Sequence, residues 1–431
     1  MSNAFTADLP HPFYGDHVLY HANTKGLAIT PVRAWAFDGW RAEALSWRKG
    51  CYIHAGLSGI GPVSIKGSQA LEYLQGLCIN SFAKFPVGSM KHAVMCNEDG
   101  LITAHGVVER LAEDHFLSFA GGPPGPTARS VEGLDVEIEI RNWYLFQIAG
   151  PTSLDVLEKV TGEDLRDLKF LRFRQTRING IECEIARLGM TGSLAYELHG
   201  PMSDAPAIYD AVYKAGQEFG IERLGWGSYL VNHIEGGFPQ HTWTFVSAPP
   251  PEKWPRAMKR WEVGGSVDPM DIRARCRTPA EVRWDNMAKF DHDFIGRDAV
   301  EAEIANPRRT TTTLRWNKDD VLDVFASLLR EGEPYKPFDF PYSPQRWPMA
   351  YADHVEKGGR PVGWSSGTIY SPHYREFLSH GCIDISEAEI GNEVTVKWGD
   401  HGGPIKEIRA TVERFPYLAQ GRNNEIDVAK L

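Results

Sequence analysis

The sequence has no run of about 18 consecutive apolar residues, the length that a membrane-spanning helix requires. Its first residues, MSNAFTADLPHPFYGDH, lack the basic region followed by an apolar region that is typical of a secretory leader. Acidic residues outnumber basic ones, 56 to 46, and basic residues gather only in short clusters such as residues 307–309. We therefore expect a cytoplasmic protein whose partners include neither nucleic acid nor an acidic membrane surface.

Cysteine is sparse, and its spacing excludes the common metal motifs. The chain has no CxxC pair and no cysteine–histidine spacing that suits zinc. We interpret the cysteines as reduced thiols and predict no structural metal. The six residues are Cys51, Cys78, Cys96, Cys183, Cys276 and Cys382.

The length of the chain and one internal similarity indicate its organisation. A chain of 431 residues is too long for one compact core and suits two or three domains. Residues 63–74 and 146–157 both read as a short alternating strand, a turn of small residues and a helix with apolar residues at i and i+3. Strand-like alternation also marks residues 106–111 and 135–140. Two α+β lobes built on one plan explain this pattern, and chance recurrence of a common unit is the alternative.

The second half of the chain changes character twice. Residues 247–277 are rich in proline and charge and have no steady period, so we interpret them as an insertion or a long surface loop. The run FIGRDAVEAEIANP predicts a helix that starts near Arg297 or Asp298 and stops at Pro307. From about Thr310 apolar and polar residues alternate between glycine-rich turns, which predicts a small antiparallel β-barrel or sandwich.

The run RLGMTGSLAYELHGP, residues 187–201, has too many glycines for an ordinary helix and too few apolar residues for a core strand. Gly189 and Gly192 flank the pair Met190–Thr191, so the backbone can turn there and present amide groups to a small ligand. Tyr196 and Glu197 follow directly. We interpret this run as part of a binding site.

This run also resembles R-x-G-Y-T-G-E-D-G-Y-E, the signature of the glycine-cleavage T-protein (aminomethyltransferase) family of tetrahydrofolate-dependent enzymes. Six further segments resemble the family in its order along the chain. They are FDGWRAEALSWRKG, YLQGLCINSF, MCNEDGLITAHGVVERL, LGWGSYLVNHIEGGFP, FIGRDAV and GRPVGWSSGTIYSP.

The resemblance implies an α+β fold of two intertwined ferredoxin-like lobes with a C-terminal β-barrel domain, and tetrahydrofolate in a central channel. We expect residues 1–305 to form the folate-binding region. One lobe would combine about 1–50 with 140–250, the other would combine 51–139 with 251–305, and residues 306–431 would form the barrel.

Departures from the family's pattern indicate a particular branch. Where aminomethyltransferases carry two aspartates, this chain has Ala104-His105, so the acid that supports aminomethyl transfer is missing. Tyr229 and His233 stand where the family carries arginines, and Ser193 replaces a glutamate. A tyrosine at position 229 resembles the tetrahydrofolate-dependent O-demethylases of vanillate, syringate and related methoxylated aromatic acids.

Methyl transfer from an aryl ether to N5 of tetrahydrofolate needs a proton donor, because the departing phenolate is a poor leaving group. Tyr229 could supply the proton, since the pKa of a phenol is about 10 and matches that of the released phenol. Arg110 is a candidate cation near the departing oxygen. His105 could act as a base or a substrate contact near N5, or could only fill the space of the lost aspartate.

The resemblance also implies a set of folate-binding residues. Glu197 would accept hydrogen bonds from the pterin ring, whose amino and ring N–H groups suit a carboxylate. Several candidate residues also have an interpretation that involves no ligand. Tyr229 could be a core residue, Arg110 a member of a surface ion pair, Asn97 a turn residue and Glu197 a solvated strand residue. The predicted cofactor-binding residues are Glu197, Tyr196, Met190, Val107, His92 and Asn97.

The methyl donor remains open at this point. The aromatic demethylases carry D-Q-S-x-H-M-like residues in the donor pocket, whereas this chain has HAGLSG at residues 54–59. A sulfonium or methylamine donor, such as dimethylsulfoniopropionate or a methylated glycine, is therefore an alternative, as is a folate-binding protein without catalysis. A third alternative is a carbon–carbon bond-cleaving enzyme that yields methylenetetrahydrofolate. The expected partner is a small-molecule methyl donor, and the oligomeric state is left open.

Overall fold

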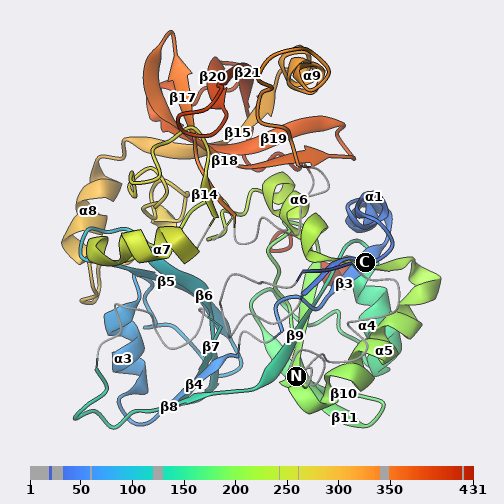
Figure 1. Ribbon diagram of the computed structural model, residues 1–431. Coiled ribbons are helices and arrows are strands. Elements are labelled where there is room, and N and C mark those ends of the chain that lie inside the picture. Colours follow the sequence, from blue (N-terminus) through green and yellow to red (C-terminus); the bar gives the residue numbers. More distant parts are fainter. Residues whose placement is uncertain are drawn as a thin grey trace, which may run out of the picture.

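The structure is a computed structural model that describes residues 19–21, 33–58, 61–119, 130–241, 243–260, 262–339, 349–419 and 422–431. The N-terminal stretch considered above and Gly59 of the HAGLSG run lie outside these ranges. Figure 1 shows two sheets side by side, with a barrel above them and helices on their outer faces. Within the described ranges, no helix is both long and apolar enough to cross a membrane.

The first lobe is built on a six-stranded sheet. All neighbouring strands are antiparallel except the edge pair β3 and β13, which is parallel. Helices α4 (Ser153–Thr161) and α5 (Ala205–Gly216) pack on one face and bury apolar side chains against it. The strands, in order across the sheet, are β10 (Phe173–Ile178), β11 (Ile181–Ala186), β12 (Ala195–Pro201), β9 (Trp143–Ala149), β3 (Cys51–His54) and β13 (Ile221–Arg223).

The second lobe is an antiparallel five-stranded sheet with α3 (Ala70–Leu77) on its outer face. Leu74 and Leu77 of α3 pack against Ile65 and Phe116 of the sheet. The strands, in order, are β5 (Met90–Cys96), β6 (Ile102–Ala112), β7 (His115–Ser118), β4 (Val63–Lys66) and β8 (Glu137–Ile140). The predicted strand–turn–helix units are therefore present, as β4 with α3 and as β9 with α4.

The chain crosses between the lobes more than once. The predicted division assigned residues from 51 onward to the second lobe, but β3 pairs with β9 and β13 of the first. Helix α8 (Arg297–Ala305) follows Gly296, as the sequence predicted, and Val300 packs with Val94 and Ile102 of the second lobe. The exact division of the chain into domains stays our proposal.

Helix α6 (Trp226–Gly236) lies at the centre of the molecule, and each of its residues is buried. It contacts β2 (Arg33–Ala36), which pairs with β1 (Leu19–His21), and β18 of the barrel. Gly237 ends the helix with φ 65°, the left-handed conformation that favours glycine. Two short helices, α1 (Trp40–Glu43) and α2 (Ser46–Lys49), precede β3.

The C-terminal part forms a closed six-stranded barrel, which confirms the predicted β-barrel. Helix α9 (Lys318–Ser327) begins at Asn317, whose side chain accepts hydrogen bonds from the backbone N–H groups of Asp319 and Asp320. The strands, in order, are β15 (Arg309–Trp316), β19 (Glu376–Asp384), β18 (Arg360–Ser371), β17 (Asp353–Lys357), β20 (Glu393–Trp398) and β21 (Lys406–Glu413).

The proline-rich region predicted as an insertion or loop contains regular structure. It holds α7 (Trp254–Arg260) and β14 (Glu262–Gly264), and β14 pairs in parallel with β16 (Met349–Tyr351). Arg275 is buried and donates hydrogen bonds to the carbonyls of Gly264 and Val267. The pairing of β14 with β16 therefore joins this region to a distant part of the chain, so the region is not a free surface loop.

Candidate functional site

A cavity of about 520 Å³ lies at the centre of the described structure, lined by residues of both lobes and of the C-terminal segment. Its volume falls in the range of small-molecule and cofactor sites, roughly 300–1,000 Å³. The wall is mostly apolar, with one carboxylate, from Glu197, and two guanidinium groups, from Arg283 and Arg422. This composition suits a flat, partly polar ligand.

The glycine-rich run of residues 187–201 forms one wall of the cavity. Gly189, Met190 and Gly192 line it, in the loop between β11 and β12. Gly192 has φ 74°, and the loop passes so close to α6 that a Cβ on Gly236 would lie 2.3 Å from the carbonyl oxygen of Thr191. The glycines thus allow the loop to lie against the helix beside the cavity.

Arg187, the first residue of that run, fixes the C-terminal segment to the loop. It is buried, and its guanidinium donates hydrogen bonds to the carbonyl oxygens of Asn423 and Ile426 at 2.7 and 2.6 Å. Asn423 in turn donates from its side-chain amide to the carbonyl of Ala195. Because Asn423 and its neighbour Arg422 line the cavity, Arg187 helps to shape the wall without contacting the cavity itself.

Glu197 is buried on β12 and is held by a chain of hydrogen bonds across the first sheet. It pairs directly with Gln147 of β9, whose side-chain amide donates to Oε1 at 3.5 Å. The Gln147 oxygen accepts a hydrogen bond from the Tyr52 hydroxyl at 2.6 Å, and Tyr52 accepts one from Asn232 of α6. The Glu197 carboxylate therefore has a fixed orientation before any ligand arrives.

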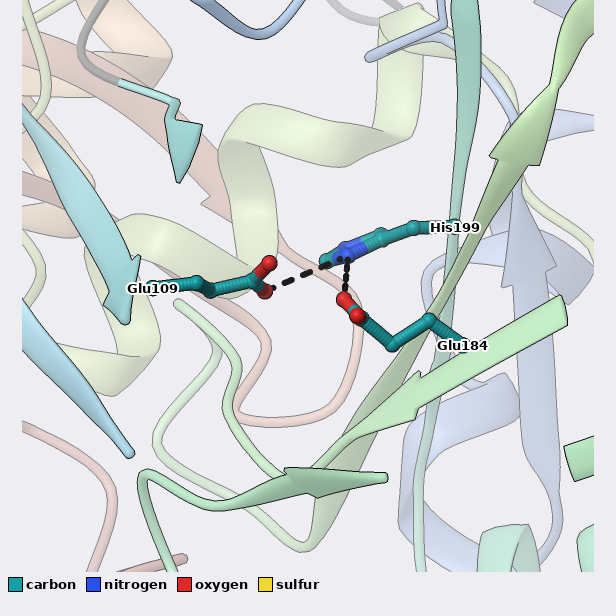
Figure 2. A group of neighbouring side chains, drawn as sticks. All are labelled: Glu109, Glu184 and His199. Carbon is teal, nitrogen blue, oxygen red and sulfur yellow. Dashed lines mark hydrogen bonds and ion pairs between the residues drawn. The ribbon is translucent and has the colours of Figure 1, made fainter. Parts of the chain in front are cut away.

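His199 contacts the other oxygen of the same carboxylate. Its Nε2 lies 3.2 Å from Oε2 of Glu197, and its Nδ1 lies 3.2 Å from Glu184 and 3.4 Å from Glu109. Figure 2 shows how Glu109, from the second lobe, meets Glu184 and His199 of the first. All four side chains are buried, and the ring of Phe119, which lines the cavity, lies over His199.

The charges of this cluster determine its protonation. Although burial alone favours the neutral imidazole, the three carboxylates raise the pKa of His199 well above its ordinary value. Burial raises the pKa of Glu109 well above its ordinary value, and the neighbouring Glu184 adds to the effect. Glu109, Glu184 and His199 also place three ligand-type atoms within 4.8 Å of one another. Because the carboxylates that contact the imidazole favour its charged form, we interpret the group as a buried ion pair.

His92 and His105 lie on the cavity wall of the second lobe. Strands β5 and β6 pair so that His92 is opposite Val107 and His105 is opposite Val94, which makes the two histidines diagonal neighbours on one face. His92 Nδ1 and His105 Nε2 are 3.2 Å apart. The ring of Trp284 lies 4.2 Å from the ring of His105, so the pair is held in place.

The cavity thus brings together five of the nine predicted site residues and leaves four aside. Tyr196 points away from Glu197 into the core of the first lobe, as expected for neighbours on a strand. Asn97 closes a turn, where its side chain accepts a hydrogen bond from the N–H of Leu101. The five that line the cavity are His92, His105, Val107, Met190 and Glu197.

The other two, Tyr229 and Arg110, agree with their alternative interpretations, as a core residue and as a member of an ion pair, and neither lines the cavity. Tyr229 is fully buried on α6, and its ring stacks on His54 with centres 4.2 Å apart and planes 12° apart. It belongs to the same apolar cluster as Leu57, which lines the cavity, but Tyr229 itself is not among the lining residues. Arg110 donates hydrogen bonds to the carbonyl of Phe85 and forms an ion pair with Glu113.

Several site residues were not found from the sequence. Glu184 and His199 pair across β11 and β12, whereas Glu109 reaches them from the other sheet, so only the packing of the two sheets reveals the contact. One signal was available: Glu197 and His199 are two residues apart on a predicted strand and so must share a face. Other residues that line the cavity include Phe119, His241, Arg283, Trp284 and Arg422.

Comparison with a solved structure defines the class of fold. The crystal structure of the glycine cleavage system aminomethyltransferase T from Bartonella henselae matches with a TM-score of 0.69 at 16% identity, covering 94% of this chain and 96% of that one. This likeness confirms the predicted aminomethyltransferase fold.

Sequence comparison then identifies the family. A profile of the GCVT N-terminal domain matches residues 3–243, more than half of the chain. The sesamin methylene transferase of Sinomonas sp. (strain No.22) is 40% identical over 420 residues, 92% of each chain. The syringate O-demethylase of Sphingobium sp. (strain NBRC 103272 / SYK-6) is 29% identical over 423 residues, 91% of each chain. The chain belongs to the GCVT family, and it is an enzyme of the branch predicted from the sequence.

Proposed function

We propose that this enzyme transfers a one-carbon group from an aromatic ether to tetrahydrofolate. The donor predicted from the sequence is a methoxylated aromatic acid similar to vanillate or syringate, and the products are the phenol and 5-methyltetrahydrofolate. The similarity to a syringate O-demethylase over 91% of the chain supports this donor class. The other relative is named as a methylene transferase of sesamin, and a methylene group is also a one-carbon group.

The residues on the cavity wall fit tetrahydrofolate. The observation that carries the proposal is the buried carboxylate of Glu197, which lines the cavity and is oriented by Gln147 and His199. A carboxylate held in this way accepts hydrogen bonds from the amino and ring N–H groups of a pterin. When bound, tetrahydrofolate supplies the nitrogen that takes the one-carbon group.

Two arginines can hold the anionic parts of the ligands. Arg283 lies on the wall with φ 61°, a left-handed conformation that is uncommon for a residue other than glycine. Backbone strain of this kind costs on the order of 1 kcal/mol and concentrates at functional sites. Arg422 lines the cavity from the C-terminal segment. A carboxylate of the aromatic acid or of the glutamyl tail of folate is the group that they suit.

The proton donor for the departing oxygen is part of the same proposal. The sequence pointed to Tyr229, with Arg110 as a supporting cation. His105 lines the cavity, whereas Tyr229 is fully buried and is not among the residues that line it, and Arg110 pairs with Glu113. We therefore favour His105 for contact with the reacting atoms.

A methylene donor is the second candidate, because the 40% identity to a sesamin methylene transferase is higher than that to the demethylase. The product would then be methylenetetrahydrofolate and a catechol. Both candidates use the same cavity. The methyl donor loses one ether bond and forms one carbon–nitrogen bond, whereas the methylene donor loses two ether bonds and forms two carbon–nitrogen bonds.

The test is anaerobic incubation of the purified protein with tetrahydrofolate and one donor at a time, with folate products read by mass spectrometry. The donors are methoxylated aromatic acids, methylenedioxyaryl compounds, dimethylsulfoniopropionate and methylated glycines. We expect 5-methyltetrahydrofolate from an aromatic ether, or the methylene form from a methylenedioxyaryl donor. A product from the sulfonium or amine donors alone would contradict the proposal, and folate binding without any product would identify a non-catalytic folate-binding protein.

A further inference from the structure

The two histidines of the cavity wall form one hydrogen-bonded unit. His92 Nδ1 and His105 Nε2 are 3.2 Å apart, the ring centres are 5.4 Å apart and the ring planes differ by 16°. These values place the shared hydrogen close to the plane of both rings, which is the favourable geometry for an imidazole–imidazole hydrogen bond. Both residues are partly exposed, and both line the cavity.

Both rings are neutral near pH 7. Burial lowers the pKa of His92 to about 4, and burial together with His92 and His241 lowers the pKa of His105 well below its ordinary value. A neutral imidazole has one N–H donor and one bare acceptor nitrogen. With one hydrogen shared between the rings, one outer nitrogen of the unit must therefore be a donor and the other an acceptor.

We propose that His92 and His105 form a proton relay that carries the proton displaced from the folate nitrogen to the departing aryl oxygen. This inference rests on the proposed function. The acceptor end takes a proton, the shared hydrogen moves from one ring to the other, and the donor end releases its own proton. The unit gains no net charge in this movement, so a relay in an apolar cavity avoids the cost of a buried imidazolium.

The atoms of the reaction balance without a further reactant. The bond between the ether oxygen and the methyl carbon breaks, and a bond between that carbon and the folate nitrogen forms. The nitrogen loses one proton, and the oxygen, which keeps the electron pair of the broken bond, gains one proton to become a phenol. A methylenedioxy donor would require the same exchange twice, once for each C–O bond. The tautomers are restored by exchange with water when the products leave.

The decisive experiment compares His105→Gln with Tyr229→Phe, the competing proton donor, over a series of aryl methyl ethers. The series varies the pKa of the released phenol. Glutamine retains a group that can hydrogen-bond to His92 but cannot pass a proton. We expect His105→Gln to slow transfer by about a hundredfold or more for weakly acidic phenols, within the usual range of acid–base catalysis, and by much less for acidic phenols. Tyr229→Phe should show no such trend.

A double-mutant cycle tests whether the two rings act as a unit. We expect His92→Gln, His105→Gln and the double variant to lose about the same activity, because breaking a relay at either ring disables it. His401→Gln, an exposed histidine of the barrel region, controls for the general effect of a histidine replacement. If the activity loss of the double variant equals the product of the two single losses, the rings act independently and the relay is overturned. The relay is also overturned if the loss of activity depends on the pKa of the released phenol in Tyr229→Phe but not in His105→Gln.

Two further measurements do not depend on catalysis. Calorimetry of tetrahydrofolate binding should show a Kd within about threefold of the original for His105→Gln, because the relay acts on transfer and not on binding. Nitrogen NMR of the ligand-free protein with labelled histidine should show two neutral rings at pH 6, and His105→Gln should change the ring signals of His92. Charged rings at pH 6 would overturn the relay. If the unaltered protein forms no folate product at all, the proposed function fails, and this outcome is distinct from an active enzyme that is indifferent to His105.

Discussion

His199 on β12 and Glu109 on β6 lie 3.4 Å apart, measured from Nδ1 to Oε1, and connect the two lobes behind the cavity. Both side chains are fully buried. The same imidazole contacts Glu197, which lines the cavity, so a charge that joins the lobes also orients the carboxylate of the site. Stability and ligand binding are thus linked through a single ring.

Replacement of His199 should destabilise the protein strongly. His199→Gln would leave Glu184 and Glu197 buried without their cation, and breaking a buried ion pair from one side costs about 3–5 kcal/mol. Glu109→Gln should cost less than His199→Gln, because burial raises the pKa of Glu109 and so favours its neutral acid, which an amide resembles. Urea unfolding at pH 7 measures both. Equal losses in the two variants would show that Glu109 is ionised and paired.

Removal of the Glu197 charge should weaken folate binding. A hydrogen bond to a charged group contributes about 1.5–3 kcal/mol, so we expect the Kd for tetrahydrofolate to rise about ten- to hundredfold in Glu197→Gln. Tyr196→Phe is the matched control, since Tyr196 is adjacent in sequence but faces the core, and its hydroxyl has no hydrogen-bond partner among the described residues. Calorimetry checks both variants. Equal weakening by the two would mean that binding depends on the integrity of β12 and not on the carboxylate.

Arg283 should distinguish acidic donors from neutral ones. We expect Arg283→Gln to raise the KM for a methoxylated aromatic acid about tenfold or more, because the carboxylate loses a charge-assisted hydrogen bond. The methyl ester of the same acid should have nearly the same KM with either enzyme. Initial-rate measurements with the acid and the ester make the comparison. If instead the KM for tetrahydrofolate rises with both donors, Arg283 holds the cofactor and not the donor.

The stability of the fold should fall with rising pH through the titration of Glu43. This carboxyl accepts hydrogen bonds from the backbone N–H groups of Phe37 and Gly225, and burial raises its pKa from 4.5 to about 7. Since the folded state holds the proton more tightly than the unfolded state, the contribution of Glu43 is complete below about pH 4.5 and is lost as the pH rises to about 7.

The loss from Glu43 should amount to about 3 kcal/mol, following from the size of its pKa shift. The free energy of unfolding, measured by urea between pH 4.5 and 8, should fall more steeply in the unaltered protein than in Glu43→Gln. Parallel curves for the two proteins would show that Glu43 keeps an ordinary pKa.

The sequence predicted the large features of the fold because they follow from local pattern. Alternation and turn residues indicated the strand–turn–helix units at β4 and β9 and the barrel strands, and the glycines of residues 187–201 indicated a loop beside a ligand. The region of residues 247–277 was misread, since α7 and β14 are short and gain their stability from contacts with distant residues such as those of β16.

The site was predictable only in part. Along a strand, period-two alternation would have separated Tyr196 from Glu197, but it could not show what either side chain faces. Helix α6 is buried on every side, so its apolar residues do not mark a single face. The sequence pattern therefore could not show toward which part of the protein the Tyr229 side chain points. The approach of His92 to His105 depends on the register between β5 and β6, which local sequence does not fix.

The sequence by itself predicted the main strands, the barrel and the family, and it pointed to Glu197 as a residue of the binding site. These follow from periodicity, turn chemistry and the order of motifs along one chain. Only the tertiary structure decided that Glu109 meets His199, that His92 and His105 form a hydrogen bond and that Tyr229 does not line the cavity. The physical reason is that these contacts join residues far apart in the chain, and their distances are set by how two sheets pack around a cavity.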